Sequence, residues 1–192
     1  GRTGRWFALE HWGVQPDIVT FAKGVTSAYL PLGGVMISRE IHQAILDAPP
    51  AERFMHAATY SAHPTCCAVA LRNLDILDRE ELVARAALLG RRLLDRLQTL
   101  RDLPVVGDVR GLGLMCGVEL VEDQRTKAPA LGLGARVLAG ARRRGLVTRM
   151  RTGQRGEHPI GDVICLAPPL VISEAQVDRI VEILREAIAA CL

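Results

Sequence analysis

Lysine is almost absent from this sequence, although positive charge is not. Of the 24 lysine and arginine residues in the 192-residue chain, only Lys23 and Lys127 are lysines. Arginine stays protonated in proteins. A lysine amine can lose its proton when it is desolvated, and it can then attack a carbonyl carbon to form an imine. The composition therefore raises the question of what an amine does that a guanidinium does not.

Other absences exclude whole classes of protein. The five cysteines are odd in number, two of them are adjacent, and none forms a C-x-x-C pair. This argues against a disulfide framework or a zinc knuckle and favours a reducing compartment. No histidine has H-E-x-x-H spacing, no apolar run reaches membrane-spanning length, and no signal peptide is visible. We therefore expect a cytoplasmic protein with no metal site and no membrane partner.

Aromatic residues and net charge are also scarce, at 4% of the chain and +3. The locally basic stretches GRRLLDRLQTLRD and GARRRGLV alternate with leucine, alanine or acids, which is typical of a solvated helix face. Nucleic-acid surfaces usually combine a basic patch with interleaved aromatic residues. We expect no nucleic-acid partner. The 49% of apolar residues is enough for a sizeable core.

One of the two lysines, Lys23, lies in the stretch TFAKGVTSAYLPLGG. It follows the apolar, β-branched run DIVTFA and precedes Gly24. That run predicts a buried strand. A charged residue at the end of a buried strand, next to a turn, is where sites on α/β sheets usually form. We expect the amine to be held out of water at a sheet edge. The local sequence alone also allows an ordinary surface cation.

Two pieces of different character follow one another along the chain. The first is a strand-rich α/β piece that runs to about residue 75, and a compact α+β piece follows it. Hydrophobic periodicity and turn residues predict strands at 17–23, 33–41, 104–111, 112–121, 146–150 and 162–172, and helices at 39–48, 64–80, 81–102, 130–145 and 173–192, the second strand overlapping the first helix. Ser173 is the expected N-cap of the last helix, because acids follow it in the first turn.

Several motifs together resemble one enzyme family. The segment GRTGRWFALEHWGVQPDIVTFAKGVTSAYLPLGGVMIS looks like the lysine segment of class III aminotransferases, the pyridoxal-phosphate enzymes of fold type I. TYSAHPTCCAVAL, VGDVRGLGLMCGVELV and GDVICLAPPLVISEAQVDRIVEIL resemble further segments of that family. The resemblance implies an α/β fold with an incomplete large, cofactor-binding domain at 1–75 and a small C-terminal domain at 76–192.

The resemblance also assigns roles to individual residues. Lys23 would form a Schiff base with pyridoxal 5'-phosphate and then act as the acid and base of proton transfer, which agrees with the chemistry of an amine. Thr59 would donate to the cofactor phosphate of the partner subunit in a homodimer, and a loop hydroxyl suits that anion. His63 and Pro64 are expected to shape the loop and start a helix.

Several arginines are candidates for binding the substrate carboxylate. Arg149 matches a position where related transaminases hold the substrate carboxylate, and a planar fork suits a carboxylate. Arg151 and Arg155 lie close by in a long segment and are substitutes for that role. Arg110 stands between glycines at a strand joint, and we expect it to pair with an acid rather than to bind substrate.

The expected reaction is transfer of an amino group from an ω-amino acid, diamine or amine to a keto acid. In the family, the acid that pairs with the pyridine nitrogen precedes the GRTG residues, so it would lie before Gly1, as would the phosphate loop and the stacking aromatic. We therefore expect a fragment. The alternatives are another class III enzyme (an aminomutase, racemase or lyase), a non-catalytic structural or dimerisation piece, and, least favoured, a cofactor-free lysine aldolase that leaves Thr59 unexplained.

Overall fold

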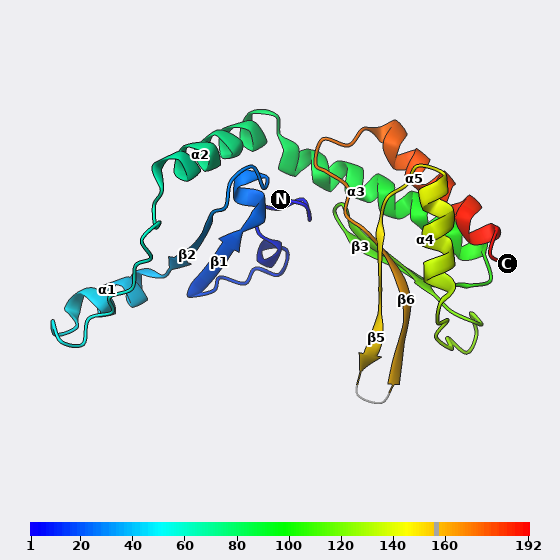
Figure 1. Cartoon of the computed structure of the whole chain (residues 1–192), viewed down its shortest axis with the longest axis horizontal. Coiled ribbons are helices and arrows are strands. Elements are labelled where there is room, and N and C mark those ends of the chain that lie inside the picture. Colours follow the sequence, from blue (N-terminus) through cyan, green and yellow to red (C-terminus); the bar gives the residue numbers. More distant parts are fainter. Residues whose placement is uncertain (156–157) are drawn as a thin grey trace. The chain divides into compact units, whose positions relative to one another are not determined.

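The computed structural model describes the backbone of residues 1–155 and 158–192 and the side chains outside residues 154–160. The chain divides into two compact units. We call Leu9–Glu81 the lysine unit, and Gly1–Ala8 together with Leu82–Leu192 the core unit (Figure 1). This division lies six residues beyond the expected boundary, and it places the first eight residues with the C-terminal part. The assignment of two functional domains remains a prediction.

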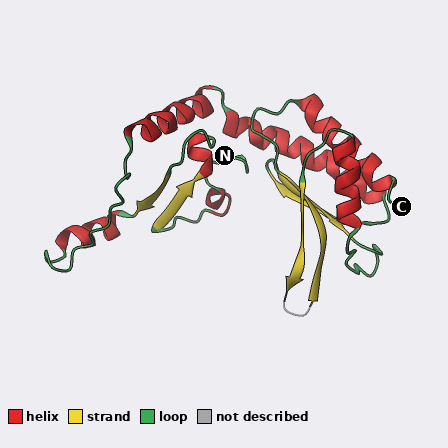
Figure 2. Cartoon of the chain, viewed as in Figure 1, coloured by secondary structure: helices red, strands yellow, loops and turns green. Residues whose placement is uncertain are grey.

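The core unit is a four-stranded antiparallel sheet with helices packed on it (Figure 2). The strands run in the order β3-β4-β6-β5. They are β3 Val106–Leu112, β4 Met115–Leu120, β5 Arg149–Arg155 and β6 His158–Leu166. The helices are α3 Leu82–Gln98, α4 Leu133–Arg143 and α5 Glu174–Ala189, with a short 3-10 helix, η3, at Thr99–Asp102. The α+β character expected from the sequence is thus present.

The three helices bury apolar stripes against this sheet. Along α3 the buried side chains recur every three or four residues, from Ala86 through Leu89, Leu93 and Leu97, which is the spacing of one helix face. The α5 helix does the same from Val177 onward. These stripes and the inner face of the strands form one continuous hydrophobic core, so the amphipathic helices predicted from periodicity are confirmed.

The two later helices are capped in different ways. In α5 the Ser173 hydroxyl accepts from the backbone N–H of Gln176 (3.2 Å), and the Gln176 amide oxygen accepts from the N–H of Ser173 (2.9 Å). This reciprocal arrangement confirms the predicted cap. Helix α4 begins at Leu133, and its N-cap residue, Gly132, has no side chain to cap it. The buried Asp162 of β6 instead accepts from the N–H of Gly134 (2.8 Å). A carboxylate from a strand therefore caps the first turn of α4 in place of a neighbouring residue in the sequence.

The first residues of the chain pack tightly on α3. A Cβ added to Gly4, which has a φ of +83°, would lie 2.6 Å from the Cβ of Ala87. A Cβ on Gly90 would lie 2.2 Å from the carbonyl carbon of Gly113, in the β3–β4 turn. The N–H of Leu114 donates to the carbonyl of Arg2 (2.9 Å). Backbone-to-backbone approach of this kind needs glycine on the helix and explains why Gly1–Ala8 belongs to the core unit.

The strand pair at the C-terminal side of the sheet differs from the prediction. The sequence indicated short strands at 146–150 and 162–172. The structure starts β5 at Arg149, continues it to Arg155, and pairs it with β6 through Gly153↔Ile160 and Arg155↔His158. The sequence did not predict this extension. The segment between the two apolar runs is polar and contains glycine, so it lacks the alternation of apolar and polar residues on which strand prediction depends.

The lysine unit contains a small antiparallel sheet and two helices. Strand β1 (Ile18–Ala22) pairs with β2 (Gly33–Ile37). The unit also contains two short 3-10 helices, η1 Ala8–Trp12 and η2 Lys23–Thr26, and two α-helices, α1 Arg39–Asp47 and α2 Pro64–Arg79. The first residue of η1 belongs to the core unit. The position of β1 agrees closely with the sequence prediction. Strand β2 ends at Ile37, four residues before the predicted end, because helix α1 begins at Arg39.

The prediction that β1 is buried is wrong for this chain. Its residues alternate between exposed and half-buried, and Ile18 is 55% exposed. Across residues 9–81, all of which the structure describes, Ala70 is the one buried apolar side chain. The physical reason is that a two-stranded sheet has no further layer within the unit to cover it.

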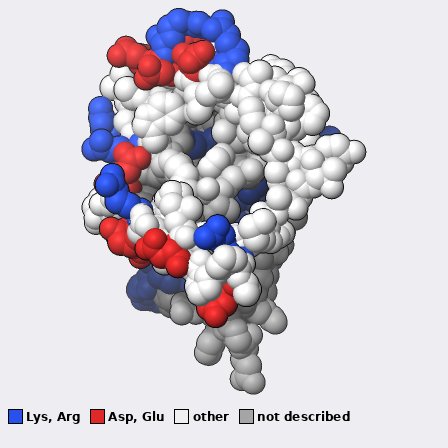
Figure 3. All heavy atoms as spheres, turned by 90° about the vertical axis from the view of Figure 1, so that its left-hand side faces the viewer, with Lys and Arg blue, Asp and Glu red and all other residues white. Residues whose placement is uncertain are grey.

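Large apolar side chains accordingly reach the surface of the lysine unit. Trp12, Tyr29, Phe54, Met55 and Tyr60 are each more than 60% exposed. Figure 3 shows a face of the chain on which uncharged residues predominate over a broad area. Exposed apolar surface on this scale usually marks a surface that another protein segment covers.

Candidate active site

The backbone at Lys23 is unusual. β1 ends at Ala22, and Lys23 opens η2 with a φ of +56°, in the left-handed region. Ser27 and Ala28, at the end of the same turn, also have positive φ values, of +49° and +63°. Each non-glycine residue in this conformation costs about 1–2 kcal/mol. Strain of this kind persists only where surrounding contacts enforce it, and it is concentrated at functional sites.

Two polar side chains hold this turn. Thr26 is buried, and its hydroxyl donates to the carbonyl of Leu30 (2.6 Å). Asn73 of α2 donates its amide N–H groups to the carbonyls of Gly24 (2.9 Å) and Val25 (3.1 Å). Its amide oxygen accepts from the hydroxyl of Ser27 (2.7 Å). The turn that carries Lys23 is therefore fixed from inside and from the neighbouring helix.

The two lysines of the chain have different surroundings. The amine of Lys127 donates to the carbonyl of Gly107 (2.7 Å), so it has a structural partner. The amine of Lys23 makes no hydrogen bond or ion pair with any part of the chain that the structure describes, and the residue is exposed. The expectation that Lys23 is held out of water is thus not met within these 192 residues, because β1 and its turn are uncovered.

Thr59 lies on an exposed turn of the same unit. The N–H of Ser61 donates to the carbonyl of Ala58 (2.9 Å), and the N–H of Ala58 donates to the Ser61 hydroxyl (3.1 Å). The Thr59 side chain between them is exposed. Within the described residues no hydrogen bond connects Thr59 with Lys23. The structure thus presents the hydroxyl without bringing it to the amine.

The start of α2 confirms a smaller prediction. Helix α2 begins at Pro64, and His63 is its N-cap residue, although the His63 side chain makes no capping hydrogen bond. Proline suits the first helical position, because the N–H that it lacks has no partner there in any case. His63 and Pro64 therefore shape the end of the loop, as expected.

The candidate carboxylate arginines belong to the core unit. Arg149 is the first residue of β5 and pairs with Cys165 of β6. Arg149 and Arg151 are both exposed and two residues apart, so they point to the same face of the strand. The side chain of Arg155 lies outside the described residues. Arg149 and Arg151 thus remain equivalent candidates on geometric grounds.

Arg110 has the structural role that the sequence indicated. Its guanidinium donates to Asp108 (2.9 Å) and to Glu119 (2.5 Å). These hydrogen bonds, first the one to Glu119, raise the pKa of Arg110. Arg110 therefore links β3 to β4 on the sheet surface and is not available to a substrate carboxylate.

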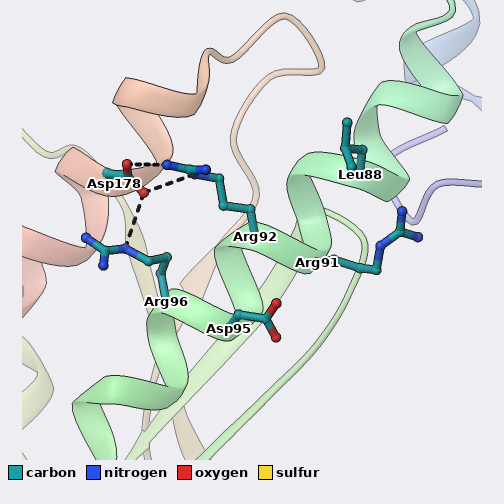
Figure 4. Close-up of a pocket in the computed structure, with 6 residues that line it drawn as sticks. All are labelled: Leu88, Arg91, Arg92, Asp95, Arg96 and Asp178. Atoms are coloured by element: carbon teal, nitrogen blue, oxygen red, sulfur yellow. Dashed lines mark hydrogen bonds and ion pairs between the residues drawn. The ribbon is translucent and has the colours of Figure 1, made fainter.

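A second group of arginines lines a hollow of about 540 Å³ along α3 and α5. Figure 4 shows Arg92 and Arg96 directed at Asp178, with Arg91 and Asp95 pointing elsewhere. Arg92 lies 2.6 Å from Asp178, and Arg96 lies 3.3 Å from it. Arg92 also pairs with Glu174 (3.1 Å). Acidic side chains of α5 already pair with Arg92 and Arg96. The arginines therefore join α3 to α5 and do not form an anion-binding site.

This cluster gives a pH-dependent prediction. The hydrogen bond from Arg92 lowers the pKa of Asp178 below its ordinary value. Such a carboxylate stabilises the fold above its unfolded pKa of about 3.9, and the contribution is lost as the pH falls through the lower folded value. We expect Asp178→Asn to lower the denaturation midpoint at pH 7, with the difference from wild type vanishing toward pH 2. A difference that persisted at pH 2 would contradict this account.

Two other kinds of site are not found in the described part of the chain. No group of three or more histidine, cysteine, aspartate or glutamate residues there is placed to hold a metal ion. None of the helices described is both long and apolar enough to cross a membrane.

Comparison with known proteins identifies the family. The family model described as "Aminotransferase class-III" matches residues 1–188. This chain is a class-III aminotransferase family member. An (S)-enantioselective ω-transaminase from Thermomicrobium roseum is 47% identical, with a TM-score of 0.87 over 100% of this chain and 41% of that one. The α/β fold of transaminases, predicted from the motifs, is therefore confirmed.

Two further proteins similar to this chain are transaminases by name. An amine transaminase from an uncultivated Pseudomonas species, solved in its PLP-bound form, is 41% identical, with a TM-score of 0.89 over 100% of this chain and 42% of that one. The putrescine–pyruvate aminotransferase of Pseudomonas aeruginosa is 36% identical over 97% of this chain and 39% of its own length. The chain spans about two fifths of the curated relatives that it matches.

The sequence did not identify Asn73 as part of this site. It stands in the stripe of α2 that also holds Ala70, Ile76 and Leu77, all buried or half-buried. An amide on the apolar face of an amphipathic helix signals a specific polar partner. That partner, the turn after Lys23, is 46 to 49 residues away in sequence, so periodicity alone does not reveal it.

Proposed function

We propose that this chain is part of a pyridoxal-phosphate-dependent aminotransferase that moves an amino group from an ω-amino acid, diamine or amine to a keto acid. The observation that carries the proposal is the difference between the two lysines. Both lysines have a left-handed backbone, but the amine of Lys127 donates to a backbone carbonyl, whereas the amine of Lys23 is free at the end of a strand. Family membership supplies the reaction class, and putrescine–pyruvate transfer by a relative supports the donor class.

The residues present fit the cofactor. An aldehyde needs a free amine, which Lys23 offers, and a phosphate needs hydroxyl and N–H donors, which an exposed threonine on a turn provides. Bound pyridoxal phosphate supplies an aldehyde for amines and a ring that accepts electrons from the substrate carbon. Lys23 would hold the cofactor through that aldehyde, and its amine would take and return the proton at the carbon that carries the amino group.

The remaining assignments concern the assembled protein. We propose that Thr59 serves the cofactor of a second copy in a homodimer, and that Arg149, or Arg151 or Arg155 in its place, holds the substrate carboxylate. The exposed apolar surface of the lysine unit supports an assembly in which further protein covers it. Such cover would also desolvate Lys23. The five free cysteines suit a cytoplasmic location.

The test is a donor–acceptor assay of the protein that carries this sequence. Putrescine, an ω-amino acid and a simple amine are each supplied with pyruvate or 2-oxoglutarate, and the amino acid formed is measured. We expect turnover that requires both substrates. Turnover of the amine with no keto acid would instead indicate a mutase, racemase or lyase.

A purely structural role is the other outcome of this assay. It is favoured by the exposure of both Lys23 and Thr59 in this chain. No turnover with any donor, together with no change in the spectrum when pyridoxal phosphate is titrated in, would establish it and refute the proposal.

A further inference from the structure

Asn73 directs both of its amide N–H donors and its carbonyl oxygen at the residues that follow Lys23. A side-chain amide has two N–H donors and one carbonyl oxygen with two lone pairs. The donors go to the carbonyls of Gly24 (2.9 Å) and Val25 (3.1 Å), and the acceptor takes the hydroxyl of Ser27 (2.7 Å). All three partners lie within four residues of Lys23. No apolar side chain and no other polar side chain of similar size offers the same set.

The turn needs this support. Two of its own backbone hydrogen bonds are long, at 3.3 Å from the N–H of Ser27 to the carbonyl of Gly24 and 3.4 Å from the N–H of Ala28 to the carbonyl of Lys23. The bond from the N–H of Tyr29 to the carbonyl of Thr26 is shorter, at 3.1 Å. The turn also holds three non-glycine residues at positive φ. A strained turn whose first two backbone hydrogen bonds are long relaxes unless neighbouring groups enforce it. The amide of Asn73 is the group that reaches it from α2.

Position matters here because the lysine side chain is long. Its amine is joined to the backbone by a flexible four-carbon stem, so only the backbone fixes the point from which it swings. A misplacement of about 1 Å at a reacting group is enough to reduce a rate about a hundredfold. A device that fixes the backbone at Lys23 therefore contributes to the reaction without touching substrate.

We propose that Asn73 is a positioning residue that locks the turn after Lys23 and thereby places its amine. The inference rests on the proposed function for its catalytic consequence. The lock itself depends only on contacts within the lysine unit. It can therefore be tested with and without the reaction.

The scarcity of lysine provides the first readout. Lysyl endopeptidase has two cleavage positions in this sequence, after Lys23 and after Lys127. A protease needs several residues of extended backbone, so cleavage at Lys23–Gly24 reports opening of the turn. Cleavage at Lys127–Ala128, where Asp123 accepts from the N–H of Thr126 (2.7 Å), is an internal reference in the same digest.

We expect Asn73→Leu, digested without cofactor, to raise the Lys23-to-Lys127 cleavage ratio about tenfold, as loss of these hydrogen bonds predicts. Ser27→Ala, which removes one bond, should give a smaller rise. Asp75→Asn, an exposed change on the same helix, should leave the ratio unchanged. An unchanged ratio in Asn73→Leu, or an equal rise at both lysines in both variants, would overturn the proposal.

The second readout separates positioning from binding. In the assembled enzyme, Asn73→Leu should lower kcat about ten- to a hundredfold with little change in KM. If wild type shows no amino transfer, the proposed function fails while the cleavage ratio still decides whether the lock exists. A rise in KM with unchanged kcat would refute the positioning role even if the turn opens.

Discussion

Replacing Lys23 by arginine is expected to lower amino transfer by about a thousandfold or more, because both covalent and proton-transfer catalysis disappear. The substitution keeps the positive charge and a long stem. It removes the one property that the chain obtains from lysine here, an amine that can be neutral and attack a carbonyl. The measurement is kcat with putrescine and pyruvate, at saturating cofactor.

Lys127→Arg is the matched control. Lys127 donates to the carbonyl of Gly107 (2.7 Å), and a guanidinium can donate to the same acceptor. We expect activity within about twofold of wild type, since surface substitutions away from special features have small effects. If Lys127→Arg removed activity while Lys23→Arg retained it, the assignment of the two amines would be reversed.

Gly90→Ala is expected to destabilise the core unit by about 2–4 kcal/mol, as a clash in a packed contact does. The added Cβ would lie 2.2–2.4 Å from backbone atoms of Gly113. Gly113 cannot move away, because its own α-carbon is held against the backbone of Arg2 and Thr3. The midpoint of guanidinium unfolding, followed by helix content, measures the effect.

Gly140→Ala is the corresponding control in helix α4. Its added Cβ would lie 3.4 Å from the Cβ of Ala187, an ordinary contact. Alanine is preferred over glycine within helices by about 1 kcal/mol. We therefore expect Gly140→Ala to be neutral or stabilising. Equal loss of stability in the two variants would show that the close approach at Gly90 is not the cause.

The sequence predicted the core unit well because its elements bury themselves. Helices α3 and α5 carry apolar stripes of helical period, and Ser173 has the residue type and neighbours of an N-cap. Such features are local and can be read along the chain. The cap supplied by Asp162 and the packing of Gly4 on α3 were not predicted, because each joins residues distant in sequence.

The lysine unit shows the opposite balance. Its strands were placed correctly, yet the expected burial of β1 failed, because an apolar run predicts what a segment can bury and not what covers it. The position of Lys23 at the end of β1 was foreseen. The left-handed backbone at Lys23 and the contacts of Asn73 were not predicted. The conformation of a single residue and a partner 46 residues away do not affect the periodicity of the sequence.

Reductive trapping tests the central claim most directly. The protein is mixed with pyridoxal phosphate, reduced with borohydride, digested and mapped by mass spectrometry, so that any amine bonded to the aldehyde carries a permanent mass label. The account predicts the label on the peptide that contains Lys23, with none on the peptide that contains Lys127. A label on Lys127 alone, or on neither lysine in a protein that transfers amino groups, would contradict it.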